Sequence, residues 1–187
     1  SSNLQTWSVI AVESQARRDQ LAQLVGQQKH LSAAPLVLVW LADLSRIERL
    51  GQAQGRDPAG LHYLDTFLMA VIDATLAAQN AVVAAEAMGL GTCYIGGMRN
   101  QPEQVAQVLG TPRQVFPVFG LVVGHPDPAR PAAIKPRLPQ SAVLHREQYH
   151  VPATAQEEIG DYNAALAAFM RAQGMPEVDW STQVVDR

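Results

Sequence analysis

The sequence predicts one layered domain of the α/β or α+β class, because strand-like and helix-like segments alternate along it. Runs rich in β-branched and aromatic residues at 6–13, 34–43 and 114–124 have the length of strands. Helical segments separate them, and the longest runs from about 61 to 88. The chain has 187 residues, near the size of one domain, so we predict a single domain over 1–187 with one principal core.

The first half of the chain is expected to contain two strands joined by a helix. Ser14 can cap the N-terminus of a helix through ARRDQLAQLV, and Gly26 can end it. The strand at 34–43, APLVLVWLAD, follows. The segment 51–60, GQAQGRDPAG, carries three glycines and a proline, so we expect a surface loop or a mobile insertion.

The long helix at 61–88 is apolar around most of its circumference, so little of it can face water in the final assembly. Such a helix is either the core helix of a domain or half of a subunit interface, and we expect it to be both. Four polar residues make it a poor membrane span: Asp73, Gln79, Asn80 and Glu86. Asp73 is interpreted as a hydrogen-bonded buried group, not a catalyst.

The second half is expected to contain short strands, helices and an extended connector. Asn100 and Glu103 have the spacing of a capping box, with Pro102 in the first turn of a helix. Five prolines within 126–139 predict a non-helical connector. The remaining elements are a strand at 92–95, the helix at 102–110, a strand at 114–124 and a last helix at 154–174.

The stretch GLGTCYIGGMRN, residues 89–100, packs four glycines around a short apolar run. It is not a dinucleotide fingerprint, because Tyr94 occupies the third glycine position and a helix precedes the glycines where a strand should. Two interpretations remain. The glycines stop the helix, turn the chain and end a strand, or Gly96 and Gly97 leave the backbone bare so that a planar ring can lie against it.

Lys135 and Arg137 lie one residue apart in the proline-rich connector. On an extended backbone both side chains point to the same side, as an anion clamp requires. The alternative is a solvated pair of charges without a ligand.

Composition excludes several function classes. The net charge of −3 and pI near 5.9 provide no basic surface for nucleic acid. Cys93 is the only cysteine, so there is no intrachain disulfide or cysteine-rich metal site, and we expect this thiol to be buried and inert. The five histidines show no metal-ligand spacing. With no secretory signal in the sequence, we expect a cytoplasmic protein without a membrane partner.

Three segments closely resemble the nitroreductase superfamily, above all its branch of NADPH-dependent oxygen-insensitive nitroreductases and NADPH-flavin oxidoreductases. They are QNAVVAAEAMGLGTCYIGGMRNQPEQVAQVLG, VFPVFGLVVGHP and KPRLPQSAVLHREQY. The resemblance covers nearly the whole chain. It implies an α+β fold, with a central, mostly antiparallel sheet flanked by helices, and an intertwined homodimer with the long helix at the subunit interface.

The resemblance also implies FMN as cofactor and NADPH as co-substrate. Two electrons would pass in ping-pong fashion to nitroaromatics, quinones or free flavin, and no catalytic side chain would be needed because the flavin carries the chemistry. Lys135 and Arg137 would hold the FMN phosphate, and Arg171 would bind NADPH. The other cofactor residues implied are Ser1, Ser2, Asn3, Gln5, Gln28, Tyr94, Ile95, Gly96 and Gly97.

Two departures from the family pattern leave alternatives open. The family begins with a helix carrying an Arg-Ser-x-Arg-like phosphate motif, and this sequence starts after it; we expect a truncation, not a true loss. Glu177 and Asp179 stand where basic residues are often found, which weakens the expectation of NADPH over NADH. The alternatives are a non-catalytic flavin-binding dimeric scaffold, and a dedicated flavin reductase that supplies a monooxygenase.

Overall fold

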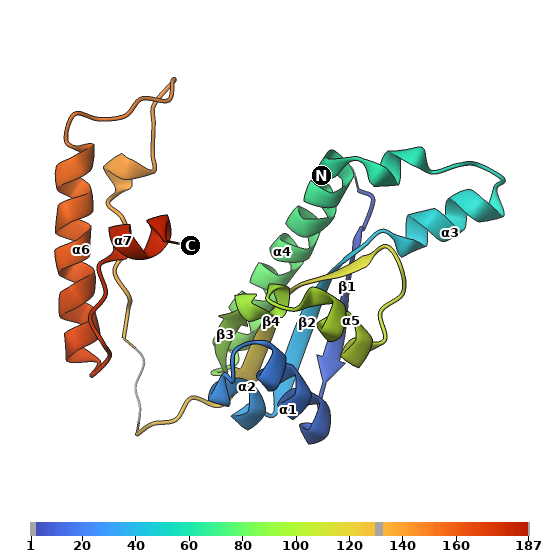
Figure 1. Cartoon of the computed structure of the whole chain (residues 1–187), viewed down its shortest axis with the longest axis horizontal. Coiled ribbons are helices and arrows are strands. Elements are labelled where there is room, and N and C mark those ends of the chain that lie inside the picture. Colours follow the sequence, from blue (N-terminus) through green and yellow to red (C-terminus); the bar gives the residue numbers. More distant parts are fainter. Residues whose placement is uncertain (1–2, 130–132, 187) are drawn as a thin grey trace. The chain divides into compact units, whose positions relative to one another are not determined.

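A computed structural model of the chain describes residues 3–129 and 133–186 (Figure 1). These residues form two compact units, one over 3–129 and one over 133–186. The expectation of a single domain stays a prediction, and each unit is described by itself.

The first unit is built on a four-stranded antiparallel sheet with the order β1-β2-β4-β3. The predicted strands are confirmed within one or two residues at each end. The observed bounds are Trp7–Val12 for β1, Leu36–Asp43 for β2, Gly91–Ile95 for β3 and Val115–Gly124 for β4. Because all neighbouring pairs are antiparallel and helices flank the sheet, the α+β class is confirmed.

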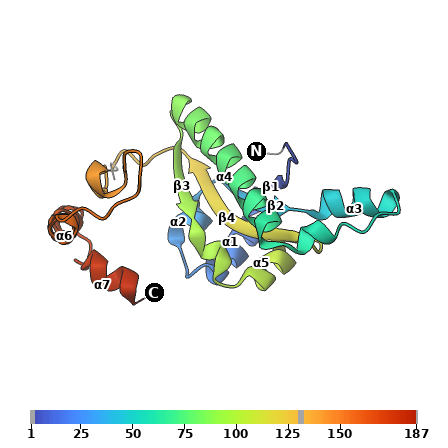
Figure 2. The same ribbon diagram turned by 90° about the horizontal axis from the view of Figure 1, so that it is seen from above.

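Alternation along β2 gives the sheet two apolar faces. Val37, Val39 and Leu41 belong to one core cluster, whereas Trp40 and Ala42 belong to the other. Figure 2 shows α4 on one face and α1, α2 and α5 on the opposite face. Successive side chains of one strand therefore reach two different helix layers.

The face under α1 (Gln15–Leu24), α2 (Lys29–Ala33) and α5 (Pro102–Leu109) is tightly closed. Leu21, Leu31, Met98 and Val105 are each 0% exposed there. Ser14 holds the N-cap position of α1 as predicted, but its side chain makes no capping hydrogen bond. The capping box predicted at Asn100 is wrong, because Gln101 is the N-cap of α5.

The opposite face is covered by α4 (Leu64–Ala87), the predicted long helix. Small residues pack it against the sheet: Ala70, Ala74 and Ala78 are 0% exposed. Gly89 follows the helix with φ +78°, and the Leu90 N–H donates to the Ala85 carbonyl, as in a glycine C-cap. The prediction of a helix stop at Gly89 is therefore confirmed.

The outer side of α4 carries a row of exposed aliphatic side chains: Leu64, Leu68, Ile72, Leu76 and Val83. Among the described residues, α4 is the one helix long and apolar enough to cross a membrane by length and composition. This criterion counts length and composition alone, and the core helix of a soluble protein meets it as well. A single helix of this kind is a weak indication of a membrane protein.

The segment predicted as a loop at 51–60 is partly helical. Helix α3 (Ser45–Ala53) runs into it, and a 3₁₀ turn, η1 (Ala59–His62), ends it. Figure 1 shows α3 projecting away from the sheet. The loop prediction is confirmed only for the residues between these two elements.

The second unit contains the 3₁₀ turn η3 (Gln140–Ala142), α6 (Ala155–Ala172) and α7 (Trp180–Val185). Helix α6 matches the last helix predicted, whereas α7 was not predicted. Asp179 caps α7 by accepting a hydrogen bond from the Thr182 N–H at 2.8 Å. The Asn163 amide on α6 donates to the Ser181 hydroxyl at 2.7 Å and so ties the two helices together.

Candidate functional site

The glycine pair lies where the edge strand β3 passes into the 3₁₀ turn η2 (Gly96–Arg99). A Cβ atom on Gly97 would stand 2.8 Å from the Val25 carbonyl oxygen, a backbone atom that cannot move aside easily. A Cβ on Gly96 would meet nothing closer than the tip of the Arg99 guanidinium, at 3.4 Å. Gly97 is therefore required by the packing of this chain, whereas the space beside Gly96 is nearly free.

Val25 also connects the glycines to Gln28. The side-chain amide of Gln28 donates to the Val25 carbonyl oxygen at 3.2 Å, the same oxygen that Gly97 approaches. Two sites that the sequence separates by about seventy residues, Gln28 and Gly96–Gly97, thus meet at the junction between α1 and α2. The structure brings these predicted cofactor residues together.

Tyr94 and Ile95 project to opposite faces of the sheet. Ile95 is 1% exposed within the closed core, so only its backbone is available to a ligand. The Tyr94 ring lies edge-on against Phe119, with a centroid distance of 5.2 Å, and its hydroxyl donates to the Gln79 amide oxygen at 3.3 Å. Burial raises the pKa of Tyr94, so its hydroxyl stays protonated at neutral pH.

Two other expectations about β3 need correction. Gly91 was predicted in a turn but begins the strand, and a Cβ there would approach the Pro126 ring at 3.1 Å. Cys93 was predicted buried but is exposed, because β3 is an edge strand of the sheet.

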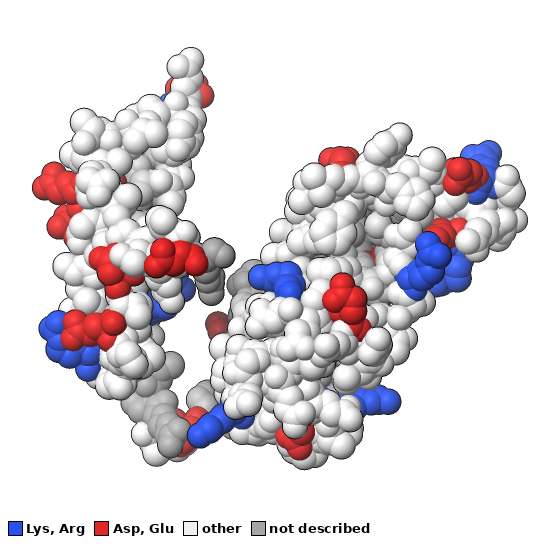
Figure 3. All heavy atoms as spheres, viewed as in Figure 1, with Lys and Arg blue, Asp and Glu red and all other residues white. Residues whose placement is uncertain are grey.

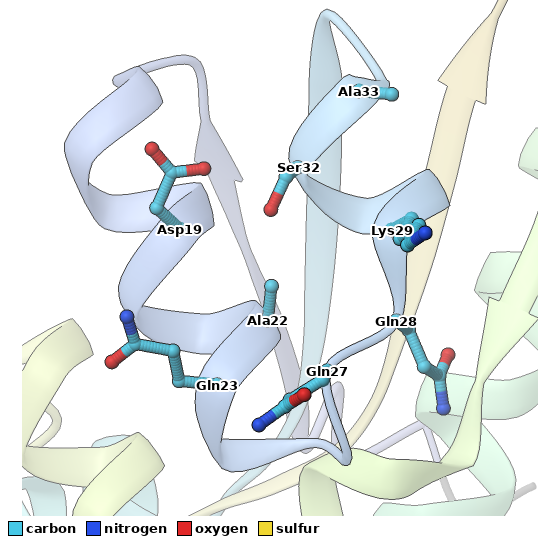
Figure 4. A pocket seen from close by; sticks show the side chains of 8 residues that line it. All are labelled: Asp19, Ala22, Gln23, Gln27, Gln28, Lys29, Ser32 and Ala33. Atoms are coloured by element: carbon cyan, nitrogen blue, oxygen red, sulfur yellow. The ribbon is translucent and has the colours of Figure 1, made fainter.

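A hollow of about 610 Å³ lies beside Gln28, between α1 and α2 (Figure 4). Asp19 and Gln23 of α1 and Ser32 of α2 flank it. Figure 4 shows Gln27 pointing toward α1 and Gln28 pointing away from it. Amide, hydroxyl and charged side chains stand around this hollow, but most of the surface that they expose to it is apolar.

A second hollow of about 610 Å³ lies on the α4 face. It is lined mostly by apolar groups, and Tyr94 is the only predicted cofactor residue in its lining. The other lining residues are Phe67, Leu68, Val71, Thr75, Gln79, Arg99, Phe116, Val118 and Phe119. It suits an apolar partner and does not contain the Gln28–Gly97 cluster.

The N-terminal segment precedes β1 and contains Asn3 and Gln5, whereas Ser1 and Ser2 lie outside the described residues. Asn3 and Gln5 have φ of +54° and +52°, in the left-handed region. Gln in this region is uncommon, so the surroundings must hold the segment in place.

Two charged side chains from different helices hold this segment. Asp73 on α4 accepts from the Thr6 N–H at 3.3 Å and the Thr6 hydroxyl at 3.1 Å, which confirms its interpretation as a hydrogen-bonded polar group. The Arg46 guanidinium on α3 donates to the Gln5 carbonyl. Arg46 gave no sequence signal, whereas Asp73 was conspicuous as a carboxylate in an apolar helix.

Asp43, at the end of β2, organises the same corner. Burial alone would raise its pKa, but hydrogen bonds from Ser45 and Ser8 and the charge of Arg46 outweigh burial and lower the pKa. The Ser45 N–H donates to Asp43 Oδ1 at 3.0 Å, an Asx turn. The Asp-x-Ser spacing after a strand was the signal that could have identified it.

Lys135 and Arg137, in the second unit, are both exposed. The Arg137 guanidinium folds back onto its own backbone and donates to the Lys135 and Pro136 carbonyls at 3.0 and 3.2 Å. The pair is accessible to an anion, and its role as a phosphate clamp stays a prediction.

Arg171 makes a bidentate ion pair with Glu177 in the second unit. The Nε–Oε1 and Nη2–Oε2 distances are 2.8 and 2.9 Å, and both side chains are substantially exposed. The pairing raises the pKa of Arg171 and lowers that of Glu177, each mainly through the hydrogen bond. A phosphate ligand of Arg171 must therefore compete with Glu177.

Charge is mixed on the surface that Figure 3 shows. Lys and Arg side chains alternate with Asp and Glu over both units on this face, and no single basic patch stands out. Among the described residues, no group of three or more His, Cys, Asp or Glu could hold a metal ion.

The fold and the glycine-ended edge strand define an α+β protein whose antiparallel sheet lies between one long helix and a layer of short helices. The chain matches the nitroreductase family over residues 1–125 and the C-terminal domain of the nitroreductase family over residues 135–187. It belongs to the nitroreductase family.

Individual relatives agree with this assignment. The chain is 38% identical over 190 residues to an FMN reductase (NADPH) of Bacillus subtilis, covering 100% of this chain and 76% of the relative. A solved nitroreductase of B. subtilis superimposes with a TM-score of 0.91 at 38% identity, covering 99% of this chain and 76% of that one. An NADPH:FMN oxidoreductase of Vibrio harveyi superimposes with a TM-score of 0.84 at 33% identity, covering 100% and 74%.

The residues at the end of β3 fit an FMN ring. A flat, polar-edged ring needs bare backbone on one side and an amide at its edge, and Gly96 and Gln28 provide these. No acidic side chain lies in contact with Gly96 among the neighbours that its Cβ would meet. The donor set is therefore chemically suitable for FMN.

Proposed function

We propose that the protein is an FMN-dependent oxidoreductase that moves two electrons from NADPH to small acceptors such as nitroaromatics, quinones or free flavin. The names of the relatives support this activity: FMN reductase, nitroreductase and NADPH:FMN oxidoreductase. FMN, when bound, supplies the hydride-accepting and electron-donating chemistry.

The observation that carries the proposal is the nearly open backbone at Gly96, next to Gly97, which packs on Val25, the residue that Gln28 also contacts. Gly97 packs against Val25 at the end of α1, and this contact fixes the distance between the end of β3 and α1. Gly96 has no comparable contact and can accept a ring face. The Gln28 amide, held through Val25, can hydrogen-bond the polar edge of that ring.

Other residues of the chain are proposed as further FMN ligands. Asn3 and Gln5 carry amides that can reach ring or ribityl oxygens, and Lys135 and Arg137 carry the charge that a phosphate requires. We assign Ser1 and Ser2 to the same segment. Replacement of Lys135 and Arg137 together by Ala is expected to weaken FMN retention about a hundredfold or more, because charge-assisted hydrogen bonds are lost.

The first test is whether the purified protein binds FMN and is bleached by NADPH without oxygen. Gly96→Ala then probes the ring site: it should weaken FMN binding at least about tenfold, because a methyl group would stand where the ring lies. The unfolding temperature of the apoprotein should hardly change, since the nearest neighbour of the new methyl group is the Arg99 guanidinium, at 3.4 Å. Unchanged FMN affinity in Gly96→Ala would exclude a ring at this position.

The outcomes of this test separate the alternatives. A yellow protein that does not bleach with NADPH or NADH is the flavin-binding scaffold, and a colourless one has lost its cofactor. A bleached protein that re-oxidises only by passing reduced flavin to a second enzyme is the dedicated flavin reductase. Rapid re-oxidation by nitroaromatics or quinones supports the proposed function.

The preference for NADPH depends on Arg171. A 2′-phosphate has to displace Glu177 from the guanidinium, so Glu177→Gln should lower KM for NADPH about twofold to fivefold, in keeping with the modest strength of exposed ion pairs. KM for NADH should stay the same. An equal effect on both would exclude the 2′-phosphate as the ligand of Arg171.

A homodimer is part of the proposal, since the aliphatic row of α4 needs a cover and the apolar hollow lies beside it. A second copy of the chain can bring its own α4 to this row. The proposal includes a cytoplasmic location and no nucleic acid partner.

A further inference from the structure

The peptide bond between Gln5 and Thr6 is held on both of its polar edges by charged side chains from two different helices. Its carbonyl oxygen accepts a hydrogen bond from the Arg46 guanidinium of α3. Its N–H donates to the Asp73 carboxylate of α4 at 3.3 Å. A cation thus sits on the negative end of the peptide dipole and an anion on its positive end.

Further contacts fix each member of this arrangement. Thr6 is 1% exposed; its hydroxyl donates to Asp73 at 3.1 Å, and its carbonyl accepts from the Asp43 N–H at 2.9 Å. Arg46 is held by Asp43 Oδ2 at 3.9 Å and by the Ser8 hydroxyl at 3.4 Å. Charge-assisted hydrogen bonds are among the stronger ones in proteins, so the peptide has one preferred orientation.

The segment before this peptide needs such an anchor. Asn3 and Gln5 both have positive φ, a conformation that costs a non-glycine residue of the order of 1 kcal/mol or more. Rotation of the Gln5–Thr6 peptide would change ψ of Gln5 and swing the whole segment 3–5. Holding the peptide plane therefore fixes the direction in which the segment leaves the sheet.

We propose that Asp73 and Arg46 are positioning residues that set the Asn3–Gln5 segment in its ligand-binding conformation before FMN arrives. This inference rests on the proposed flavin site. Neither side chain need touch the cofactor; they act through the Gln5–Thr6 peptide. The benefit is preorganisation, because the ordering of the segment is completed before binding.

The test combines two measurements on four variants. FMN affinity is measured by flavin fluorescence quenching on titration of the apoprotein, and hydrogen exchange is measured at the Thr6 amide in the FMN-free protein. The variants are Asp73→Ala, Asp73→Asn, Arg46→Met and the double variant Asp73→Ala/Arg46→Met. Asp65→Ala is the matched control, an exposed carboxylate on the same helix.

Asp73→Ala and Arg46→Met should each raise Kd for FMN about tenfold and speed exchange at Thr6, because a charge-assisted hydrogen bond is lost. Asp73→Asn keeps one acceptor oxygen and should restore Kd to within about threefold of wild type. Kd for FMN in the double variant should be only slightly higher than in the more strongly affected single variant, because both residues hold one peptide. Asp65→Ala should behave as wild type.

The results separate this inference from the proposed function. If wild type does not bind FMN, the flavin site fails and the positioning role fails with it, whatever the exchange data show. If wild type binds FMN and Asp73→Ala binds it equally well, the flavin site stands and the positioning role is overturned. Fully additive losses in the double variant would also overturn it, because they would indicate two separate roles.

Discussion

The two faces of the sheet are covered in different ways. Under α1, α2 and α5 the cover is closed: large side chains such as Leu21 and Met98 are 0% exposed. Under α4 the contact is made by alanines, and the large side chains of the helix, such as Ile72 and Leu76, are more than half exposed. The closed face buries its large side chains within this unit, whereas the large side chains on the outer row of α4 stay exposed.

Ile72→Glu should have the largest effect, and it tests the open face. A carboxylate in a buried interface is strongly unfavourable, so the dimer dissociation constant should rise about a thousandfold. Analytical ultracentrifugation measures this, with Glu48→Gln on the exposed α3 as a control. A variant that stays dimeric at nanomolar concentration would show that the row on α4 is not the interface.

Leu21→Ala tests the closed face. It should reduce the free energy of unfolding by about 2–5 kcal/mol, because it leaves a cavity in a fully packed cluster. Urea unfolding at fixed protein concentration measures the loss. Leu50→Ala, at a side chain 55% exposed, should change it by less than about 0.5 kcal/mol. Similar losses in both variants would contradict the contrast between covered and uncovered positions.

Gly97→Ala tests whether the closed face reaches the candidate site. The new methyl group would clash with the Val25 backbone, so we expect a loss of about 1–3 kcal/mol in unfolding free energy. Gly96→Ala should leave the apoprotein nearly unchanged. Equal unfolding free energies for Gly97→Ala and Gly96→Ala would contradict the close contact between Gly97 and the Val25 backbone.

Asp43→Asn tests the end of β2, the strand whose side chains reach both faces of the sheet, and its effect should be the smallest. The pKa of Asp43 is lowered below the ordinary value of 3.8 in the folded state, so its ionised form stabilises the fold above that pH. This contribution is lost as the pH falls from about 3.8 through the folded pKa. The difference in unfolding free energy between wild type and Asp43→Asn should therefore shrink below pH 4, and a constant difference would contradict it.

The sequence predicted the strands and the longest helices because each carries a local signal. The continuous apolar run in 34–43, the apolar length of 64–87 and the glycine after it are all local features of the sequence. Helix α3 was missed because its amphipathic pattern is short and runs into glycines. The antiparallel order of the sheet came only through the family resemblance.

The candidate site was predictable in part. Gln28 and Gly96–Gly97 were found by resemblance, and the structure explains their proximity through Val25. The contact that makes Gly97 necessary could not be read from the sequence, since Val25 is an ordinary apolar residue at the end of a helix. Arg46 was equally invisible, because its role depends on where a backbone carbonyl forty-one residues earlier lies.

Helix α4 carries Ile72 on its outer row and Asp73, the next residue, on the Gln5–Thr6 peptide. A slide of the helix by one residue, about 1.5 Å along its axis, is enough to break a hydrogen bond of this length. If the subunits associate through that row and the segment binds FMN, as proposed, association and flavin occupancy would be thermodynamically linked, and dilution of the protein would lower its FMN affinity. The amount of enzyme in a cell would in this way help to determine how much of it carries cofactor.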